Sequence, residues 1–291
     1  MSETHRRPVD AALARALVDT QYAGVDPAGA AGELRLVDRG MDNVIFRLGR
    51  KLAVRLPVRE EAAPLIDHEA RWLAEVSEPL TLATPVPVFL GEPQDDYPWR
   101  WTVCPWIDGE PLARLPVESR GGIVDDLAEA LVALHRPAPA DAPANPYRGV
   151  ALVDRDEVVS ARIERFDGPV DALGAAWRRA LAAPAWPGPP YWLHGDPHPL
   201  NLLHRDGRLS GLIDFGDLTS GDPASDLAAA WWCFGPADRA RFVGRVRATG
   251  RYDAHVWERA AGWAASLASA IRPDTPMAPV ARHTAAQLAR A

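Results

Sequence analysis

The chain has 291 residues, of which 47% are hydrophobic and 24% are charged. These proportions are typical of a globular protein, and the length is sufficient for a large core in one domain or two. The formal net charge of -7 argues against a nucleic-acid partner, because proteins that bind nucleic acids neutralise phosphates with a concentrated basic face.

The sequence predicts neither a membrane-spanning segment nor a disulfide framework. The N-terminal sequence MSETHRR is polar and charged, which predicts no signal peptide, and the uncharged run AAGWAASLASAI is too short to span a bilayer. Cys104 and Cys233 are far apart in the sequence, which favours neither a disulfide framework nor a thiolate metal site. We therefore expect a cytoplasmic protein, a monomer or a homodimer, without a membrane partner.

The first part of the chain is predicted to form a small antiparallel sheet. Residues 8–21 show helical spacing, and residues 33–57 contain three short strand-like runs separated by the turn sequences RGMD and GR. Residues 60–77 return to helical spacing, which we interpret as a helix with Glu69 on a different face from its apolar side chains. Two extended runs, VPVFLGE and YPWRWTVCPWI, complete an expected N-terminal lobe at residues 1–104.

The rest of the chain is predicted to be mainly helical. Helical patterns occupy residues 118–136, 156–166 and 170–183, and several more follow residue 225. Pro-rich connectors at residues 137–146 and 184–190 predict exposed loops. We expect these elements to form a second, larger lobe at residues 105–291.

One stretch in the second lobe carries most of the polar chemistry, HGDPHPLNLLHRDGRLSGLIDF, which begins at His194. YWLHGD predicts a short strand leading into a loop, and NLLH and RLSGLIDF predict a hairpin that turns at RDG. This arrangement brings Asp196, Asn201 and Asp214 to one pocket floor. Each of the three alone would be an ordinary turn or capping residue.

The spacing of these three residues is the one that phosphoryl transfer uses, because that reaction depends on positioning and charge neutralisation. One aspartate orients the attacking hydroxyl, while the asparagine and a second aspartate hold Mg²⁺ through hard oxygen ligands. Asp196, Asn201 and Asp214 fit these roles in that order.

The motifs HGDPHPLN, LIDFGD, GDP and SDLA, taken together, resemble those of the aminoglycoside phosphotransferases and their wider family of small-molecule kinases. The resemblance implies an α+β, protein-kinase-like fold with two lobes: a small antiparallel-sheet lobe with one helix, and a larger, mainly helical lobe. It implies Asp196 as the catalytic base, Asn201 and Asp214 as ligands of Mg²⁺, and ATP or GTP as co-substrate. It also implies that Asp226 of SDLA braces the catalytic loop.

The same resemblance assigns nucleotide contacts to the first lobe, with three departures from the kinase pattern. Arg55 stands where kinases keep a lysine, with Glu69 as its ion-pair partner; an ordinary surface pair is the alternative. The loop from Gly40 to Asn43 has a single glycine for offering N–H groups to phosphate. Pro105 lacks an N–H, which leaves Cys104 and Trp106 as the expected donors to a purine base.

The acceptor side is predicted from fewer signals. His198, Asp217 and Trp231 are candidate acceptor contacts, although a tryptophan at the start of a helix is often a packing residue. An aminoglycoside-type antibiotic is the first expectation for the acceptor, with a macrolide or another metabolite hydroxyl as the alternative. Two other functions stay open. One is a nucleotide-binding protein without turnover, and the other is a zinc site of the H-x-D-x-H kind in the run His194, Asp196, His198 and His204, with His198 and His204 as the possible ligands.

Overall fold

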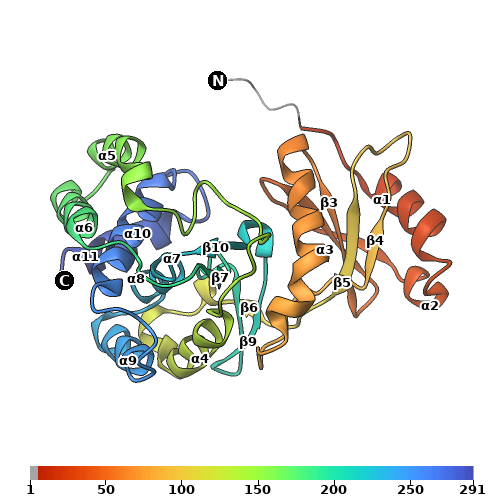
Figure 1. Ribbon diagram of the computed structural model, residues 1–291. Helices are drawn as coiled ribbons and strands as arrows, with labels where there is room; N and C mark the ends of the chain where they lie inside the picture. The colour runs from red at the N-terminus through yellow and green to blue at the C-terminus, as the bar shows by residue number, and fades with distance from the viewer. Residues whose placement is uncertain (1–5, 291) are drawn as a thin grey trace. The chain divides into compact units, whose positions relative to one another are not determined.

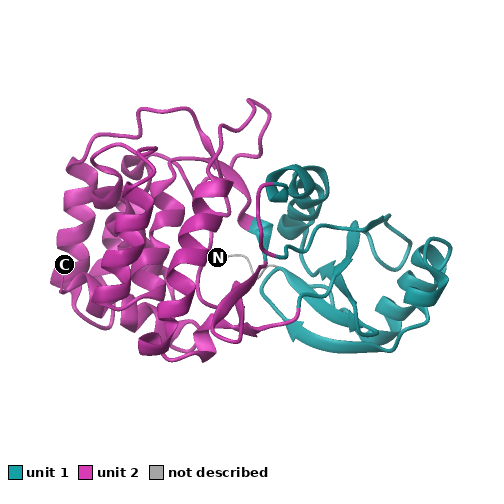
Figure 2. Ribbon diagram, turned by 90° about the horizontal axis from the view of Figure 1, so that it is seen from below, with its two compact units in different colours: residues 1–78, 83–107, 214–216 teal, residues 79–82, 108–213, 217–291 magenta. Residues whose placement is uncertain are grey.

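The computed structural model of the protein describes residues 6–290 (Figure 1). The chain divides into two compact units, which Figure 2 shows in separate colours. Unit 1 takes the chain up to residue 78 together with residues 83–107 and 214–216, and unit 2 contains the remainder. The first unit therefore extends past the predicted boundary at residue 104, and it also includes a short segment from the C-terminal half.

Unit 1 is built on a five-stranded antiparallel sheet in the order β1-β2-β3-β5-β4. Its strands are β1 (Leu34–Arg39), β2 (Asn43–Leu48), β3 (Leu52–Pro57), β4 (Phe89–Gly91) and β5 (Trp101–Pro105). The predicted three-strand meander is confirmed, and the two later extended runs supply β4 and β5. Side chains on β2 alternate between half-buried and buried, as expected for a strand with one face on the core.

Helices cover both faces of this sheet, with α3 (Ala63–Ser77) on one side and α1 (Ala11–Leu17) and α2 (Pro27–Ala30) on the other (Figure 1). Asp10 caps α1 by accepting the Leu13 N–H at 2.9 Å. Leu17 of α1 belongs to the same buried cluster as Val54 and Leu56 of β3. Because side chains alternate along a strand, Arg55 points to the opposite face of β3.

The α3 helix buries a face that includes a charged residue. Its buried side chains are Ile66, Glu69, Trp72, Leu73 and Val76. Positions 66, 69, 73 and 76 are separated by three or four residues and therefore share one helical face. The prediction that Glu69 lies on a different face is wrong, and the partner that makes its burial possible is described below.

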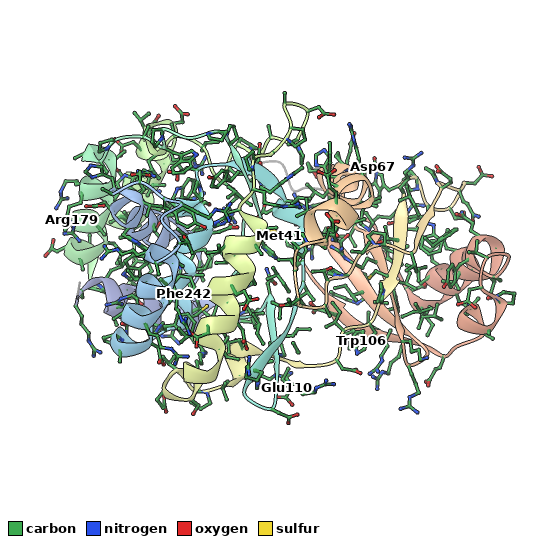
Figure 3. The ribbon with its side chains drawn as sticks, turned by 60° about the horizontal axis from the view of Figure 1, so that its bottom comes forward. Met41, Asp67, Trp106, Glu110, Arg179 and Phe242 are labelled. Atoms are coloured by element: carbon green, nitrogen blue, oxygen red, sulfur yellow. The ribbon has the colours of Figure 1, made fainter. Side chains whose placement is uncertain are left out.

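Unit 2 is a helical assembly centred on α10 (Val256–Ala270), most of whose residues are buried. A Cβ on Gly262 would lie 2.2 Å from the Ala180 Cβ, so α10 packs closely on α6 (Val170–Ala182). The buried Phe242 of α9 is labelled in Figure 3. The other helices are α4 (Val124–Leu134), α5 (Asp156–Glu164), α7 (Ala224–Leu227), α8 (Ala229–Cys233), α9 (Pro236–Arg247) and α11 (Ala278–Leu288).

One predicted helix of unit 2 is divided. Residues 118–136 were expected to be one helix, but Val117–Ile123 form a 3-10 helix and only Val124–Leu134 are α-helical. Gly121 and Gly122 lie in the 3-10 part, and glycine is a weak α-helix former. Among residues 6–290, no helix is both long enough and apolar enough to cross a membrane.

Short strands in unit 2 carry the stretch that begins at His194. β7 (Tyr191–Leu193) pairs with β10 (Thr219–Gly221), and β8 (Leu202–Arg205) pairs with β9 (Arg208–Leu212) and with β6 (Glu110–Pro111). The β8–β9 hairpin turns at Asp206 and Gly207, whose φ angles are 53° and 76°. Two successive residues with positive φ are the requirement of a tight type I′ turn, so the predicted turn at RDG is confirmed.

Candidate active site

The loop after β7 is held by one buried carboxylate. Asp226 is fully buried and accepts the N–H groups of His194 at 2.8 Å and Gly195 at 2.9 Å. His135 Nε2 lies 3.4 Å from the same carboxylate. The predicted role of Asp226 as a brace is therefore confirmed, and the backbone that enters the loop is fixed before it reaches Asp196.

Gly195 makes the turn into this loop possible. Its φ is +87°, and a Cβ at this position would lie 2.3 Å from the Asp217 carbonyl oxygen. Both the backbone conformation and the contact exclude a side chain.

We expect Gly195→Ala to lower the free energy of unfolding by at least about 2 kcal/mol, because strain in φ adds to a backbone clash. Chemical denaturation followed by circular dichroism measures the change. Gly244→Ala is the matched control, since Gly244 lies within α9 with nothing within 4 Å of the added Cβ. The control should be stabilised by up to about 1 kcal/mol, and equal losses in both variants would contradict the assignment.

The Asp196 carboxylate has a positive or polar group on each oxygen. His198 Nε2 lies 3.4 Å from Oδ2, and Arg148 Nη2 lies 3.6 Å from Oδ1. Burial alone would raise the pKa of this carboxyl, but His198, Arg148 and His194 outweigh burial and hold the pKa below its ordinary value of 3.8. The carboxylate is therefore ionised at neutral pH and ready to accept a hydrogen bond from a hydroxyl.

Both loop histidines use their two ring nitrogens within unit 2. His194 Nδ1 lies 3.2 Å from the Asp196 N–H, and its Nε2 lies 3.0 Å from the Ile213 carbonyl oxygen. A carbonyl only accepts, so Nε2 carries the proton and Nδ1 is the acceptor. His198 Nδ1 accepts the Leu200 N–H at 3.2 Å, while its Nε2 faces Asp196.

This hydrogen bonding argues against His194 as a zinc ligand. Both of its ring nitrogens contact backbone groups, and zinc sites take histidine through a ring nitrogen. Within the described part of the chain, no three His, Cys, Asp or Glu side chains gather as a metal-binding group. The two histidines support the loop, and His198 Nε2 faces the Asp196 carboxylate.

Asn201 presents an oxygen ligand because of the way its amide is held. Its side chain is 7% exposed, and Nδ2 donates to the Asp196 carbonyl oxygen at 3.0 Å. The carbonyl can only accept, so the amide nitrogen must face it and Oδ1 is directed elsewhere. The Asn201 carbonyl accepts the Ile213 N–H at 2.9 Å, and Asp214 is the next residue in the chain.

In unit 1, Arg55 connects two carboxylates. Arg55 and Glu69 are 5% and 1% exposed, and they form a two-contact ion pair in which Nη2 lies 2.9 Å from Oε1 and Nη1 contacts Oε2. Arg55 Nη2 also lies 3.7 Å from Asp214 Oδ1. Burial alone would lower the pKa of Arg55, but Glu69 and Asp214 outweigh burial and raise it. The pair is buried, which rules out the surface-pair alternative.

Asp214 has an unusual backbone as well as an accessible carboxylate. Its φ is +61°, a left-handed conformation that aspartate tolerates better than most residues other than glycine, and its side chain is 57% exposed. The carboxylate of Asp214 and the amide oxygen of Asn201 are both hard oxygen donors, the kind that Mg²⁺ takes together with substrate phosphates, so these residues fit the ion.

The loop between β1 and β2 is a closed turn. The Gly40 N–H donates to the Asn43 carbonyl oxygen at 2.9 Å, so this N–H is used within the turn. Asp42 is paired with Arg59, with 2.6 Å between Oδ1 and Nε, and Met41 at the tip is 73% exposed (Figure 3). The Asn43 amide oxygen is buried without a hydrogen-bond partner among the described residues. Of the backbone N–H groups that were expected to bind phosphate at Gly40–Asn43, that of Gly40 is therefore already used.

The connector after β5 uses the N–H groups that were expected to serve a purine base. The Trp106 N–H donates to the Lys51 carbonyl oxygen at 2.7 Å, so the prediction for this donor is wrong. Bonded pairs recur at every second residue of an antiparallel ladder, and Cys104 opposite Ala53 therefore also directs its N–H to β3. The Arg47 guanidinium stacks on the Trp106 ring, with 4.5 Å between the guanidinium carbon and the ring centroid.

The three candidate acceptor residues differ in availability. His198 is engaged as described, and Asp217 lies 2.7 Å from Asn145 Nδ2 and 3.0 Å from Arg148 Nη2 through its two oxygens. Trp231 is 6% exposed and packs near Trp257, with 6.3 Å between ring centroids. This burial matches the packing alternative and leaves little of the Trp231 ring for an acceptor.

Arg148 is the residue that the sequence analysis missed. It lies in an irregular segment just after the Pro-rich connector, where no motif marks it. The only signal in the sequence is the glycine that follows, Gly149. In the structure its φ is +66°, a backbone conformation that favours glycine.

Comparison with known proteins is consistent with this geometry. A model of the phosphotransferase enzyme family matches residues 33–263. The uncharacterized protein YcbJ of Bacillus subtilis (strain 168) is 24% identical over 238 residues, which are 72% of this chain and 73% of that protein.

Solved structures share the fold. The GDP and kanamycin complex of APH(2")-IIIa has a TM-score of 0.66 at 18% identity, covering 87% of this chain and 89% of its own. A macrolide 2'-phosphotransferase type I has a TM-score of 0.58 at 21% identity, covering 97% of both chains. The α+β, kinase-like fold expected from the sequence, with a small antiparallel sheet and a larger helical part, is thus confirmed.

Proposed function

Since the chain belongs to the phosphotransferase enzyme family, we propose that it transfers the γ-phosphoryl group of ATP or GTP to a hydroxyl of a small molecule. The observation that carries this proposal is the braced loop in which His198 and Arg148 flank the ionised carboxylate of Asp196. That carboxylate orients the acceptor hydroxyl and accepts its proton as the oxygen attacks phosphorus.

The other residues neutralise charge. Asn201 and Asp214 would hold Mg²⁺, which when bound would offset the negative charge of the nucleotide phosphates. Arg55 is held by Glu69 and directs its guanidinium to the phosphates in place of a lysine. The buried ion pair supports this role, because a pair kept only for stability would gain nothing over apolar side chains of similar volume.

For the acceptor, an aminoglycoside is the first candidate, because the structurally similar APH(2")-IIIa is described in complex with kanamycin. One observation favours a second candidate, a metabolite hydroxyl without a cationic group beside it. Arg148 places a fixed cation 3.6 Å from Asp196, and Asp217 has both oxygens in use. Ammonium groups next to the reacting hydroxyl would therefore meet a cation and few free carboxylates.

A panel of acceptors tests the proposal. ADP or GDP release would be followed with aminoglycosides, macrolides and neutral sugars, and with EDTA added to matched samples. We expect release that depends on an acceptor and stops when the divalent metal is removed. Nucleotide binding without acceptor-dependent release would favour the alternative of a binding protein without turnover.

A further inference from the structure

Beside the catalytic loop lies a guanidinium that belongs to no recognised motif. Arg148 Nη2 is 3.0 Å from Asp217 Oδ2 and 3.6 Å from Asp196 Oδ1. The Arg148 side chain is 17% exposed, and the side chains of Asp196 and Asp217 are 24% and 31% exposed. One cation therefore offsets the repulsion between two partly desolvated carboxylates, one of which is the proposed base.

The backbone that carries Arg148 is fixed to the segment before Asp226. The Gly149 carbonyl oxygen accepts the Asp222 N–H at 2.9 Å. A Cβ on Gly221 would lie 2.2 Å from the same carbonyl oxygen, so the two backbones are in direct contact. The backbone next to Arg148 is thus held by residues 221–222, a few residues before Asp226, which braces the catalytic loop.

The far end of the side chain is fixed by Asp217. Asn145 Nδ2 donates to Asp217 Oδ1 at 2.7 Å, which leaves Oδ2 for Arg148. Thr219 Oγ1 donates to the Pro143 carbonyl oxygen at 2.9 Å and holds the connector alongside residues 217–219. Asp217 therefore orients Arg148, which in turn faces Asp196.

The guanidinium of Arg148 has its charged contacts on one nitrogen. Nη2 faces both Asp217 and Asp196, while Nη1 lies 3.5 Å from the Tyr147 carbonyl oxygen. The carboxylates of Asp196 and Asp217 are therefore its charged partners.

We propose that Arg148 is a positioning residue for Asp196: with His198 on Oδ2, it fixes Oδ1 and so sets the plane in which the carboxylate meets the acceptor hydroxyl. This inference rests on the proposed function, in which Asp196 is the base. Arg148 acts through Asp196 and does not touch the phosphoryl group.

Kinetics of Arg148→Ala test the proposal. We expect kcat to fall about 100-fold, because a misplaced reacting group costs about that factor, while KM for the nucleotide stays near its wild-type value. Guanidinium ion, added below denaturing concentrations, should restore part of kcat by occupying the vacated place. Arg148→Lys, which keeps the charge without the planar fork, should give an intermediate kcat and serves if the alanine variant does not fold.

Arg208→Ala is the matched control, since Arg208 forms an exposed pair with Asp126 in the same unit, with 2.6 Å between Nη2 and Oδ1. It should keep the wild-type kcat and show no response to guanidinium. Wild-type kcat in both Arg148 variants would overturn the proposal, as would a fall in kcat that guanidinium leaves unchanged.

Crystal structures separate this proposal from the proposed function. In Arg148→Ala, we expect Asp196 to change rotamer while the His194 and Gly195 contacts to Asp226 persist. This comparison stands even if the wild-type protein phosphorylates nothing in the panel, a result that would count against the function alone. An unchanged Asp196 rotamer in the variant would overturn the positioning role.

Discussion

Replacement of Asp196 by asparagine should reduce kcat by about 10²- to 10⁴-fold, which is the range expected when a general base is lost. The amide has the size of the carboxylate but lacks the charge that His198 and Arg148 face on its two oxygens. In the proposed function other residues bind the nucleotide, so the KM for the nucleotide should change far less than kcat. Steady-state kinetics with the best acceptor from the panel measures both constants.

The control for this variant is Asp206→Asn, the same chemical change at the tip of the β8–β9 hairpin. Asp206 has a φ of 53°, a conformation that asparagine also tolerates, so the turn should be kept. This variant is expected to have the wild-type kcat. An Asp196→Asn protein with the activity of the Asp206→Asn protein would show that Asp196 is not the base.

The second large effect is expected in unit 1, where Glu69→Ala should lower the free energy of unfolding by about 3–5 kcal/mol. The substitution leaves the Arg55 guanidinium buried, with Asp214 at 3.7 Å as its remaining carboxylate. A loss of this size is a large share of the total stability of a typical domain. Urea denaturation followed by fluorescence or circular dichroism measures it.

An exposed ion pair that involves another residue of α3 provides the comparison. Asp67 (Figure 3) lies 3.3 Å from Arg100, and the two side chains are 50% and 43% exposed. Asp67→Ala should therefore change the free energy of unfolding by less than about 1 kcal/mol. Similar losses from Glu69→Ala and Asp67→Ala would contradict a special role for the buried pair.

A double variant separates the stability of the Arg55–Glu69 pair from its function. Apolar side chains often replace a buried ion pair without loss of stability, so Arg55→Met with Glu69→Leu should recover much of what Glu69→Ala loses. The same protein should bind nucleotide poorly, because no cation remains at that position. Recovery of both stability and nucleotide binding would mean that Arg55 has no contact with phosphate.

Local patterns predicted much of the fold because each reflects a short-range rule. The hairpin at RDG follows from the positive φ angles that Asp206 and Gly207 tolerate, and the meander of unit 1 follows from side-chain alternation. The loop that carries Asp196 and Asn201 was predicted because these two residues are close in sequence. The brace from Asp226 came from the family resemblance, since nothing in the local sequence links it to His194.

The features that escaped prediction depend on partners that are distant in sequence. The resemblance gave Glu69 as the partner of Arg55, but the burial of Glu69 on the apolar face of α3 was missed, because helical spacing alone places a charged residue on the exposed face. Nothing in the sequence shows that the Trp106 N–H has a partner, but the strand register pairs this N–H with the Lys51 carbonyl oxygen. Arg148 lies in irregular chain without periodicity, so only the three-dimensional structure places it against Asp196 and Asp217.

Transfer of label from a γ-labelled nucleoside triphosphate tests the central claim most directly. The wild-type protein would be incubated with labelled ATP or GTP, Mg²⁺ and each acceptor of the panel, with the Asp196→Asn protein alongside. We predict that label appears on the hydroxyl of an acceptor with the wild-type protein and is reduced to near background with the variant. Nucleotide that binds but keeps its label with every acceptor, or that yields only free phosphate, would contradict the assignment as a small-molecule phosphotransferase.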